Sequence, residues 1–385
     1  MSTTPWVTIV GIGMNGVEGL TPEQRQAIDD ADILAGGKRH LEMIPDNGSE
    51  RLQWRAPFIE SLEKVLAYKG RKVTVLATGD PMWFGIGATL SHRVGEDEMK
   101  VLPAPSAFSL AAARMAWPLA DIECLSTHGR PIETLISFLT PDAKLLILTA
   151  NGDAPKDIAK LLVAQGFGES RFTVLGNLGS DDELKIESPA AEWGGKEAHD
   201  LNTVAVICHA GLNARIFPRT GGLPDNAFIH DGQITKREVR AVTLSSLQPL
   251  PGQLLWDVGA GCGSIAIEWM RSARNARAFS IEKNPKRRDM IKNNALGLGT
   301  PSLEIVAGSA PDEFRDLEAP DAIFIGGGLT TNNVLSSCWK ALKSGGRIVA
   351  NSVTLESEAM LIDAQNNFGG ELIKISIDRT REVGS

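Results

Sequence analysis

The sequence predicts an α/β protein with two domains, the second of which contains a doubly wound parallel sheet. Three observations support this prediction. The 385 residues exceed the roughly 250 to 300 that one hydrophobic core accommodates. Short apolar runs alternate with amphipathic helical segments, most regularly after residue 235. Several of these runs end in turns that contain glycine, as the strands of ligand-binding α/β sheets do.

The first half contains strands that are predicted from apolar runs ending in small or polar residues. The first run, 7–13, precedes a helix predicted over 20–34, with Thr21 as its cap, Pro22 in its first turn and Gln24 completing a capping box. Residues 100–117 contain a strand, a proline-rich bend and a second helix. The other predicted strands lie within 72–81, 144–152, 172–179 and 203–211.

The second half follows a stretch, residues 210–232, that is rich in glycine and proline and has no clear period, and we place the domain boundary there. After it, helices and strands alternate strictly. This alternation predicts a parallel sheet with ligands at the carboxyl ends of its strands. The predicted helices are 235–247, 264–273 and 286–299, and the predicted strands are 254–260, 276–282, 302–310, 321–327 and 346–354, with further helical segments after the last two strands.

Composition and charge exclude several classes of protein. With 43% apolar and 22% charged residues and no apolar run of about 18 residues, the chain is predicted to be a soluble globular protein without a membrane partner. The net charge of −8 argues against a nucleic-acid partner. No signal peptide is visible, and the four scattered cysteines form no C-x-x-C pair. We therefore expect a cytoplasmic protein with no disulfide framework and no bound metal.

A glycine-rich loop, WDVGAGCGS at 256–264, follows a predicted strand of the second half. It has the pattern D-x-G-x-G-x-G, and Glu282 ends the next strand, a position from which a carboxylate reaches a ribose. The third glycine comes one residue too early for the dinucleotide fingerprint. The pattern resembles the S-adenosylmethionine loop of the Rossmann-like class I methyltransferases. A glycine turn kept only for close packing is the alternative.

A second loop, VGIGMNG at 10–16, satisfies Gly-x-Gly-x-x-Gly literally. The helix after it begins only near Thr21, and the next apolar run offers no acid for a ribose, so this loop disfavours a nicotinamide cofactor. Two further stretches, TGDPMWFGIG at 78–87 and PAPSAFSLAAA at 103–113, are each explained singly as a turn and a helix cap. Together with VGIGMNG and LTP they resemble the tetrapyrrole (class III) methyltransferase family. This resemblance implies a two-lobed α/β fold that holds S-adenosylmethionine between its lobes.

Other motifs extend the resemblance along the whole chain. LSTHGRP and GNLGSDDE in the first half, and TKREVRAVTLSSL, AGSAPDEF, FIGGG and NSVTLES in the second, stand in the order typical of the fused methyltransferases of cobalamin (vitamin B12) biosynthesis. The resemblance implies methylation of precorrin-6B at carbons 5 and 15 and decarboxylation of its ring-C acetate, giving precorrin-8X. It assigns carbon-5 methylation to residues 1–215 and carbon-15 methylation with decarboxylation to residues 233–385, joined by a linker over 216–232.

The resemblance also implies two S-adenosylmethionine sites, both at strand-end turns. The contacts expected in the first half are Gly11, Gly13, Gly79, Asp80, Met82, Ser106 and Ala107. Those expected in the second half are Asp257, Gly259, Gly261, Gly263, Glu282, Gly308, Ser309 and Ala310. Because bridging carbons of a reduced tetrapyrrole are already nucleophilic, positioning worth roughly 7 to 11 kcal/mol is the expected source of catalysis, and no catalytic acid or base is assigned.

A polycarboxylated substrate on an acidic protein requires local cations. The candidates are Lys38, Arg39, His40, His128, Arg130, Lys236, Arg237 and Arg240, together with Asn351 at a strand end. For His128, Lys236 and Arg237, a turn or a solvated surface position is the alternative.

One feature departs from the class I pattern, because the sheet of that family usually finishes with an antiparallel hairpin and here the seventh strand is expected to be missing. We also expect a homo-oligomer. Three other functions stay open at this point: methylation of RNA or protein, non-catalytic tetrapyrrole binding, and a nicotinamide-dependent oxidoreductase built on the Gly11 loop.

Overall fold

The computed structural model describes residues 5–380 and divides into two compact units. The first unit comprises residues 1–130 and 141–214, and the second comprises residues 131–140 and 215–385. Each unit is described by itself below. Short 3₁₀ helices connect the longer elements at η1 (Gly16–Gly19), η2 (Glu96–Glu98), η3 (Leu119–Asp121), η4 (Ile132–Phe138), η5 (Ala190–Glu192), η6 (Asp225–Ala227) and η7 (Asp312–Phe314).

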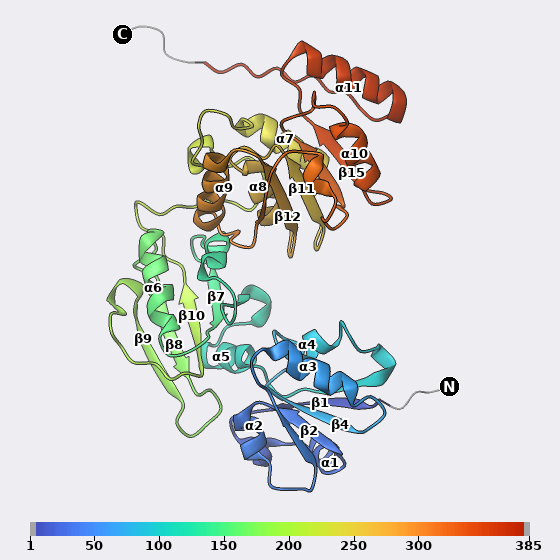
Figure 1. Ribbon diagram of the computed structural model, residues 1–385. Helices are drawn as coiled ribbons and strands as arrows, with labels where there is room; N and C mark the ends of the chain where they lie inside the picture. The colour runs from blue at the N-terminus through green and yellow to red at the C-terminus, as the bar shows by residue number, and fades with distance from the viewer. Residues whose placement is uncertain (1–4, 381–385) are drawn as a thin grey trace. The chain divides into compact units, whose positions relative to one another are not determined.

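The first lobe of the first unit is a parallel five-stranded sheet with the order β3-β2-β4-β1-β5. Its strands are β1 (Val7–Ile12), β2 (Ile33–Gly36), β3 (Glu50–Gln53), β4 (Val73–Thr78) and β5 (Met99–Leu102). Its helices are α1 (Pro22–Asp29), α2 (Lys38–Met43), α3 (Phe58–Ala67) and α4 (Ile86–Leu90). Helices α1 and α2 cover one face of the sheet, and α3 and α4 cover the other (Figure 1). Apolar side chains of α1 and α2 belong to one core cluster, and those of α3 and α4 belong to a second.

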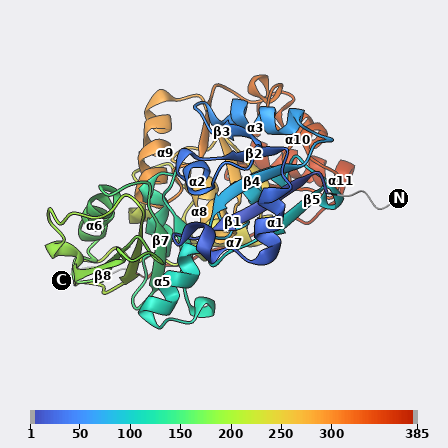
Figure 2. The ribbon, with the colours of Figure 1, turned by 90° about the horizontal axis from the view of Figure 1, so that it is seen from below.

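The second lobe of the first unit is a mixed sheet with the order β6-β7-β10-β8-β9, in which only the β6–β7 pair is parallel. Its strands are β6 (Glu123–Ser126), β7 (Lys144–Leu148), β8 (Arg171–Gly176), β9 (Leu184–Pro189) and β10 (Asn202–Ile207). Helix α5 (Ala107–Met115) packs on β7 and β10, and Figure 2 shows it beside β7, whereas α6 (Ala154–Ala164) packs on η5. Ser106 begins α5 as its N-cap, accepting a hydrogen bond from the Ser109 backbone at 3.0 Å.

The second unit is a doubly wound parallel sheet with the order β13-β12-β11-β14-β15. Its strands are β11 (Leu254–Val258), β12 (Arg277–Glu282), β13 (Glu304–Ala307), β14 (Ala322–Ile325) and β15 (Arg347–Ala350). Its helices are α7 (Arg237–Leu247), α8 (Ser264–Ser272), α9 (Pro285–Gly297), α10 (Val334–Ala341) and α11 (Leu355–Phe368). Apolar side chains of α7, α8 and α9 share one core cluster, and those of α10 and α11 share the cluster on the opposite face. The strand order reverses between β11 and β14, which is where sheets of this kind bind ligands.

The predicted elements are confirmed with two differences. The helix predicted over 20–34 ends at Asp29, because the buried strand β2 begins at Ile33, directly after Asp30, Ala31 and Asp32. Its predicted start is confirmed, with a capping box between Thr21 and Gln24. Elements such as β3, α3, β6 and β9 were not predicted. In the described part of the second unit the sheet has five strands, and residues 370–380 add none to it.

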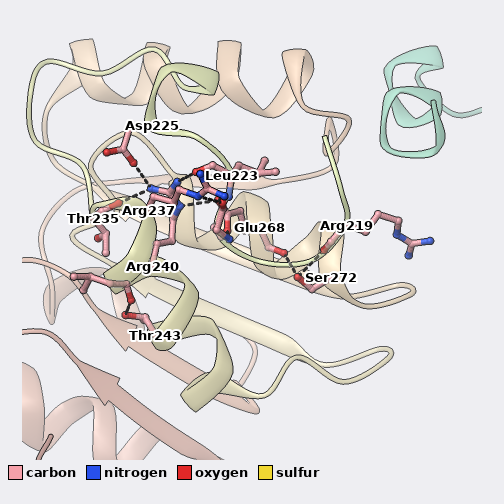
Figure 3. A network of polar contacts seen from close by, with 12 residues as sticks. Arg219, Leu223, Asp225, Thr235, Arg237, Arg240, Thr243, Glu268 and Ser272 are labelled. Atoms are coloured by element: carbon pink, nitrogen blue, oxygen red, sulfur yellow. Dashed lines mark hydrogen bonds and ion pairs between the residues drawn. The ribbon is translucent and has the colours of Figure 1, made fainter. Parts of the chain in front are cut away.

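A buried polar network attaches residues 219–225 of the interdomain stretch to helices α7 and α8 (Figure 3). The side chain of Arg240 is 0% exposed, and its Nε donates to Glu268 Oε1 at 2.6 Å. The other Glu268 oxygen accepts from the Gly222 amide at 2.6 Å, while Arg240 also donates to the Leu223 carbonyl and to Asp225. Because each buried charge is paired and hydrogen-bonded, the network holds this part of the predicted linker as an integral part of the second unit.

Residues 131–140 lie between two strands of the first unit in sequence but belong to the second unit. Ser137 Oγ donates to the carbonyls of Leu298 and Gly299 at 3.3 and 3.1 Å, and Arg271 donates to Ser137 Oγ at 3.1 Å. The Arg219 guanidinium lies 5.0 Å from the ring centroid of Phe138. Gly299 has a positive φ of 80°, and a Cβ there would lie 2.7 Å from the Ser137 backbone nitrogen. We call residues 131–140 the strap; no pattern in these residues predicts this packing.

Among the described residues, every helix falls short of the length and apolarity that crossing a membrane requires.

Candidate active sites

The first unit encloses a cavity of about 460 Å³ where the strand-end loops of its first lobe face its second lobe. This volume lies within the range of small-molecule and cofactor pockets. Turns after β1, β4 and β5 line one side, through Gly13, Gly79 and Ser106. The second lobe lines the other through Leu148, Leu175, Thr203 and their neighbours.

Glycine lets the three turns of the first lobe approach one another. A Cβ on Gly11 would lie 2.0 Å from the Gly79 carbonyl oxygen, and a Cβ on Gly79, whose φ is +60°, would lie 3.0 Å from the Pro105 oxygen. The Gly79 amide donates to Ile12 O at 3.0 Å, and the Ala104 amide donates to Gly79 O at 3.1 Å. The close approach brings the ends of β1, β4 and β5 together as one wall of the cavity.

The structure brings most of the cofactor residues predicted in the first half to this cavity. The lining includes Gly13, Gly79, Asp80, Ser106 and Ala107. Asp80 Oδ1 accepts a hydrogen bond from the Met82 amide at 2.9 Å, which fixes the start of the β4–α4 turn. Gly11 and Met82 do not line the cavity; Gly11 lies beneath it, packed against Gly79.

The structure brings some, but not all, of the substrate residues predicted in the first half to the cavity. His40, His128 and Arg130 line the cavity, whereas Lys38 and Arg39 do not. Lys38 is exposed and lies 3.7 Å from Glu42. Arg39 donates to Thr78 Oγ1 at 3.1 Å, next to His40, whose Nε2 lies 3.0 Å from the same hydroxyl. Burial, together with the neighbouring Arg39 charge, lowers the pKa of His40 to about 4, so its imidazole is neutral at pH 7.

The second site lies at the switch point of the sheet in the second unit. Gly259, Gly261 and Gly263 all have left-handed φ values, of 70°, 61° and 78°, and Gly263 is the residue from which α8 begins. A Cβ on Gly259 would lie 2.7 Å from Gly327 Cα, because the turns after β11 and β14 pass close together. The loop therefore exposes backbone at a helix N-terminus, where electron-rich ligand groups are favoured.

Two buried carboxylates flank this loop. Asp257 Oδ2 accepts from the Ala266 amide at 3.2 Å, whereas its buried Oδ1 has no partner. Burial raises the pKa of Asp257 to about 7, and the nearby Glu282 charge acts in the same direction. Glu282, at the end of β12, accepts from the Gly261 and Asn284 amides, both at 2.9 Å. A buried oxygen without a partner indicates a place that a ligand donor can fill.

The remaining predicted residues of the second half are placed as follows. Gly308, Ser309 and Ala310 follow β13 at the same carboxyl edge of the sheet. Asn351 follows β15, and its Nδ2 donates to Thr243 Oγ1 of α7 at 3.0 Å. Lys236 and Arg237 are exposed at the start of α7, and Arg237 donates to the Gly222 carbonyl at 3.0 Å. Arg240 is fully buried in the network of Figure 3, so the structure gives it an anchoring role in place of the predicted substrate contact.

Three aromatic residues that line the first cavity were not predicted. Trp83 and Phe84 follow Met82 in the β4–α4 turn, and Phe108 lies in the first turn of α5. A usable signal was present, because two adjacent large aromatics in a glycine-bounded turn depart from ordinary turn composition.

The residues present fit S-adenosylmethionine in both units. In the second, a left-handed glycine loop, an unpartnered buried Asp257 oxygen and a strand-end Glu282 offer acceptors for ammonium and hydroxyl groups. In the first, a largely apolar cavity bordered by glycine turns offers space beside exposed backbone. These two constructions define an α/β protein whose two units carry differently built glycine turns at the ends of their strands.

Comparison with known proteins identifies both units. Residues 7–193 match the family described as Tetrapyrrole (Corrin/Porphyrin) Methylases, and residues 226–385 match the Precorrin methyltransferase domain. A Sinorhizobium protein named precorrin-6Y C(5,15)-methyltransferase [decarboxylating] is 46% identical over 99% of this chain and 92% of its own length.

Two shorter relatives each match one half. A Salmonella typhimurium cobalt-precorrin-7 C(5)-methyltransferase is 35% identical over 52% of this chain and 98% of its own length. A Saccharolobus solfataricus protein named probable cobalt-precorrin-6B C(15)-methyltransferase (decarboxylating) is 34% identical over 38% of this chain and 77% of its own length. Fold, sites and relatives thus define an S-adenosylmethionine-dependent C-methyltransferase. The chain belongs to the precorrin-6Y C(5,15)-methyltransferase (decarboxylating) family.

Proposed function

We propose that this chain transfers methyl groups from S-adenosylmethionine to carbons 5 and 15 of precorrin-6B and removes the ring-C acetate carboxyl, giving precorrin-8X. The observation that carries the proposal is the presence of two differently built strand-end glycine sites on one chain. Separate relatives named for C(5) and for C(15) methylation support it, since each is similar to only part of this chain, over 52% and 38% of it.

The proposed division of labour follows the two halves. Residues 1–215 carry carbon-5 methylation, residues 233–385 carry carbon-15 methylation and decarboxylation, and residues 216–232 link them. The attachment of residues 219–225 to α7 and α8 supports treating this part of the linker as part of the second domain.

Each domain is proposed to hold its own S-adenosylmethionine. In the first, the holding residues are Gly13, Gly79, Asp80, Ser106 and Ala107, all of which line the cavity. In the second, Asp257 and Glu282 accept hydrogen bonds beside the Gly259–Gly263 loop, and the Gly308–Ala310 turn lies at the same edge of the sheet. When bound, S-adenosylmethionine supplies an electrophilic methyl group.

The protein's own contribution is chiefly to hold and orient. A bridging carbon that is already nucleophilic needs alignment with the methyl group, and fixed strand-end turns supply that alignment. In the first cavity, the exposed Arg130 and His128 are available for substrate carboxylates. The neutral His40 imidazole lies beside Thr78, where it adds a polar contact without adding charge.

A calorimetric titration of the full chain with S-adenosylhomocysteine tests the proposal. Two molecules are expected to bind per chain, with Asp80→Ala removing one and Glu282→Ala the other. Asp97→Ala and Glu304→Ala, which replace exposed acids elsewhere in the same units, serve as matched controls. A single site per chain, or loss of both sites in either variant, would contradict the proposal. Mass spectrometry of the product should then show two added methyl groups and one lost carboxyl.

A cytoplasmic location and a homo-oligomeric state complete the proposal. Light scattering on the purified chain tests the second point, and a mass equal to one chain would contradict it.

A further inference from the structure

Two large aromatic side chains are partly exposed in the lining of the first cavity. Trp83 is 40% exposed and Phe84 is 38% exposed, whereas large aromatic side chains are usually buried in the core. Their rings pack against Phe108, which is 0% exposed, with centroid separations of 5.5 and 6.0 Å. We call Trp83, Phe84 and Phe108 the aromatic shelf. Phe108 acts as its base, so the two exposed rings are supported by the core beneath them.

The backbone holds the shelf in a strained conformation. Phe84 has a φ of +57°, which bulky residues rarely adopt. The turn cannot relax easily around it, because Cβ atoms on Gly85 and Gly87 would lie 2.6 and 2.8 Å from the Pro81 carbonyl oxygen. Strain of this kind persists where the surrounding structure fixes it, and it clusters at ligand-binding sites. Here it directs an aromatic ring to the cavity.

A cation stands over the same ring. The Cζ atom of Arg130 lies 4.9 Å from the centroid of the Phe84 ring, and Arg130 itself is exposed and lines the cavity. Contact with the ring face leaves the N–H groups at the guanidinium edge available for a planar carboxylate. The cavity thus presents aromatic faces and a carboxylate-binding edge side by side.

We propose that Trp83 and Phe84 form the platform on which a conjugated part of the tetrapyrrole macrocycle rests, while Arg130 pairs with one of its carboxylate side chains. This inference rests on the proposed function and names the residues that would select the substrate class at the first site. A flat, apolar ring system that carries carboxylates matches both parts of the arrangement, since aromatic faces attract the ring and the guanidinium attracts the acid. The adenine of S-adenosylmethionine, the other flat group proposed to bind in this unit, carries no carboxylate on its ring.

The test uses the full chain and two probes: uroporphyrin III, an air-stable polycarboxylated tetrapyrrole followed by its absorption, and S-adenosylhomocysteine, followed by calorimetry. Trp83→Leu and Phe84→Asn remove the rings, and asparagine is chosen because it adopts the left-handed conformation readily. These two substitutions and Arg130→Gln are each expected to weaken uroporphyrin binding about tenfold. The affinity for S-adenosylhomocysteine is expected to stay unchanged in all three variants. Trp339→Leu, which removes a 47% exposed ring of α10 in the second unit, and Arg93→Gln are the matched controls.

The possible outcomes separate the inference from the proposed function. If the unmodified chain binds uroporphyrin and the three variants bind it as tightly as the controls do, the inference about the aromatic shelf is overturned and the proposed function stands. If the variants lose S-adenosylhomocysteine instead, the rings hold the adenine and the inference is again overturned. If the unmodified chain binds no tetrapyrrole, both fail. Thermal unfolding of each variant checks that the first unit remains folded, and a raised KM at constant kcat for carbon-5 methylation is the expected kinetic signature.

Discussion

The two units use glycine at the ends of their strands in different arrangements. In the first, Gly11 and Gly79 let separate turns touch, since a Cβ on Gly11 would overlap the Gly79 carbonyl. In the second, Gly259 also lets two turns touch, but it stands with Gly261 and Gly263 in one loop of left-handed φ values that leads directly into α8. Similar glycine patterns therefore build a wall between lobes in one case and a helix-terminus loop in the other. The spacing of the glycines in the sequence does not by itself show which of these two arrangements a loop adopts.

The largest expected effect is that of Gly11→Ala, which places a Cβ 2.0 Å from a backbone oxygen that no side-chain movement relieves. We expect a loss of at least about 5 kcal/mol in the free energy of unfolding of the first unit, because β1 or the Gly79 turn must shift. Differential scanning calorimetry should show this loss and no change in the second unit. Gly195→Ala is the control, since its Cβ would meet no atom within 4 Å. Equal stability of both variants would disprove the packing argument.

Next in size is Glu268→Ala in the second unit. The change leaves Arg240 charged and buried and also removes the acceptor of the Gly222 and Leu223 amides. A loss of about 3 to 5 kcal/mol is expected, measured as the free energy of unfolding of the second unit. Glu318→Ala breaks an exposed pair with Arg277 and should cost under about 1 kcal/mol. Comparable losses in the two variants would show that the Arg240 network does not hold the linker.

The two units should also respond oppositely to pH. The folded-state pKa of Asp257 is raised to about 7, so the second unit is most stable where this carboxyl is protonated and loses stability as pH rises from about 4 to 7. The expected loss is about 2 to 4 kcal/mol, from 1.36 kcal/mol per pKa unit. Asp257→Asn should flatten this dependence in calorimetric scans across that range. An unchanged slope in the variant would mean that another group is responsible.

The smallest predicted effect concerns His40 in the first unit. Its folded-state pKa is lowered to about 4, so the neutral form is favoured by folding, and stability is lost as pH falls from about 6.5 to 4. We expect a loss of about 1 to 2 kcal/mol, reduced from the full linkage value because the ring is only partly buried. His40→Gln should remove the loss, and His92→Gln, an exposed control, should not. If both variants keep the acid-side slope, the assignment fails.

Much of the second unit was predictable because local signals and tertiary structure agree there. Strands such as 254–258 are mostly apolar, helices have their own periodicity, and Asp257 and Glu282 stand at strand ends, where the sheet order brings them together. The buried Arg240 could not be foreseen, because a basic residue on a helix is more often exposed. Its burial is explained by the positions of its partners, which include Asp225, Glu268 and the Leu223 carbonyl.

The first unit was predicted less completely. Short strands such as β3, whose residues are mostly exposed, give no strong alternation, and the mixed pairing of the second lobe depends on contacts distant in sequence, such as that of β7 with β10. Asp80 and Ser106 were expected from the resemblance of their motifs to the tetrapyrrole methyltransferases, and both line the cavity. The strap and the aromatic shelf were missed because each depends on partners far away in the chain, Leu298 and Gly299 for Ser137 and Phe108 for Trp83.

Because the strap leaves the first unit after residue 130 and rejoins it at residue 141, the polypeptide passes from one unit to the other three times rather than once. Severing the backbone within residues 210–232 would therefore remove only one of three covalent crossings. A gene split at this point would yield a leading fragment that carries ten residues of the second unit, and a trailing fragment in which Arg271 lacks the Ser137 hydroxyl that accepts one of its hydrogen bonds. The two units are therefore not two consecutive stretches of the chain.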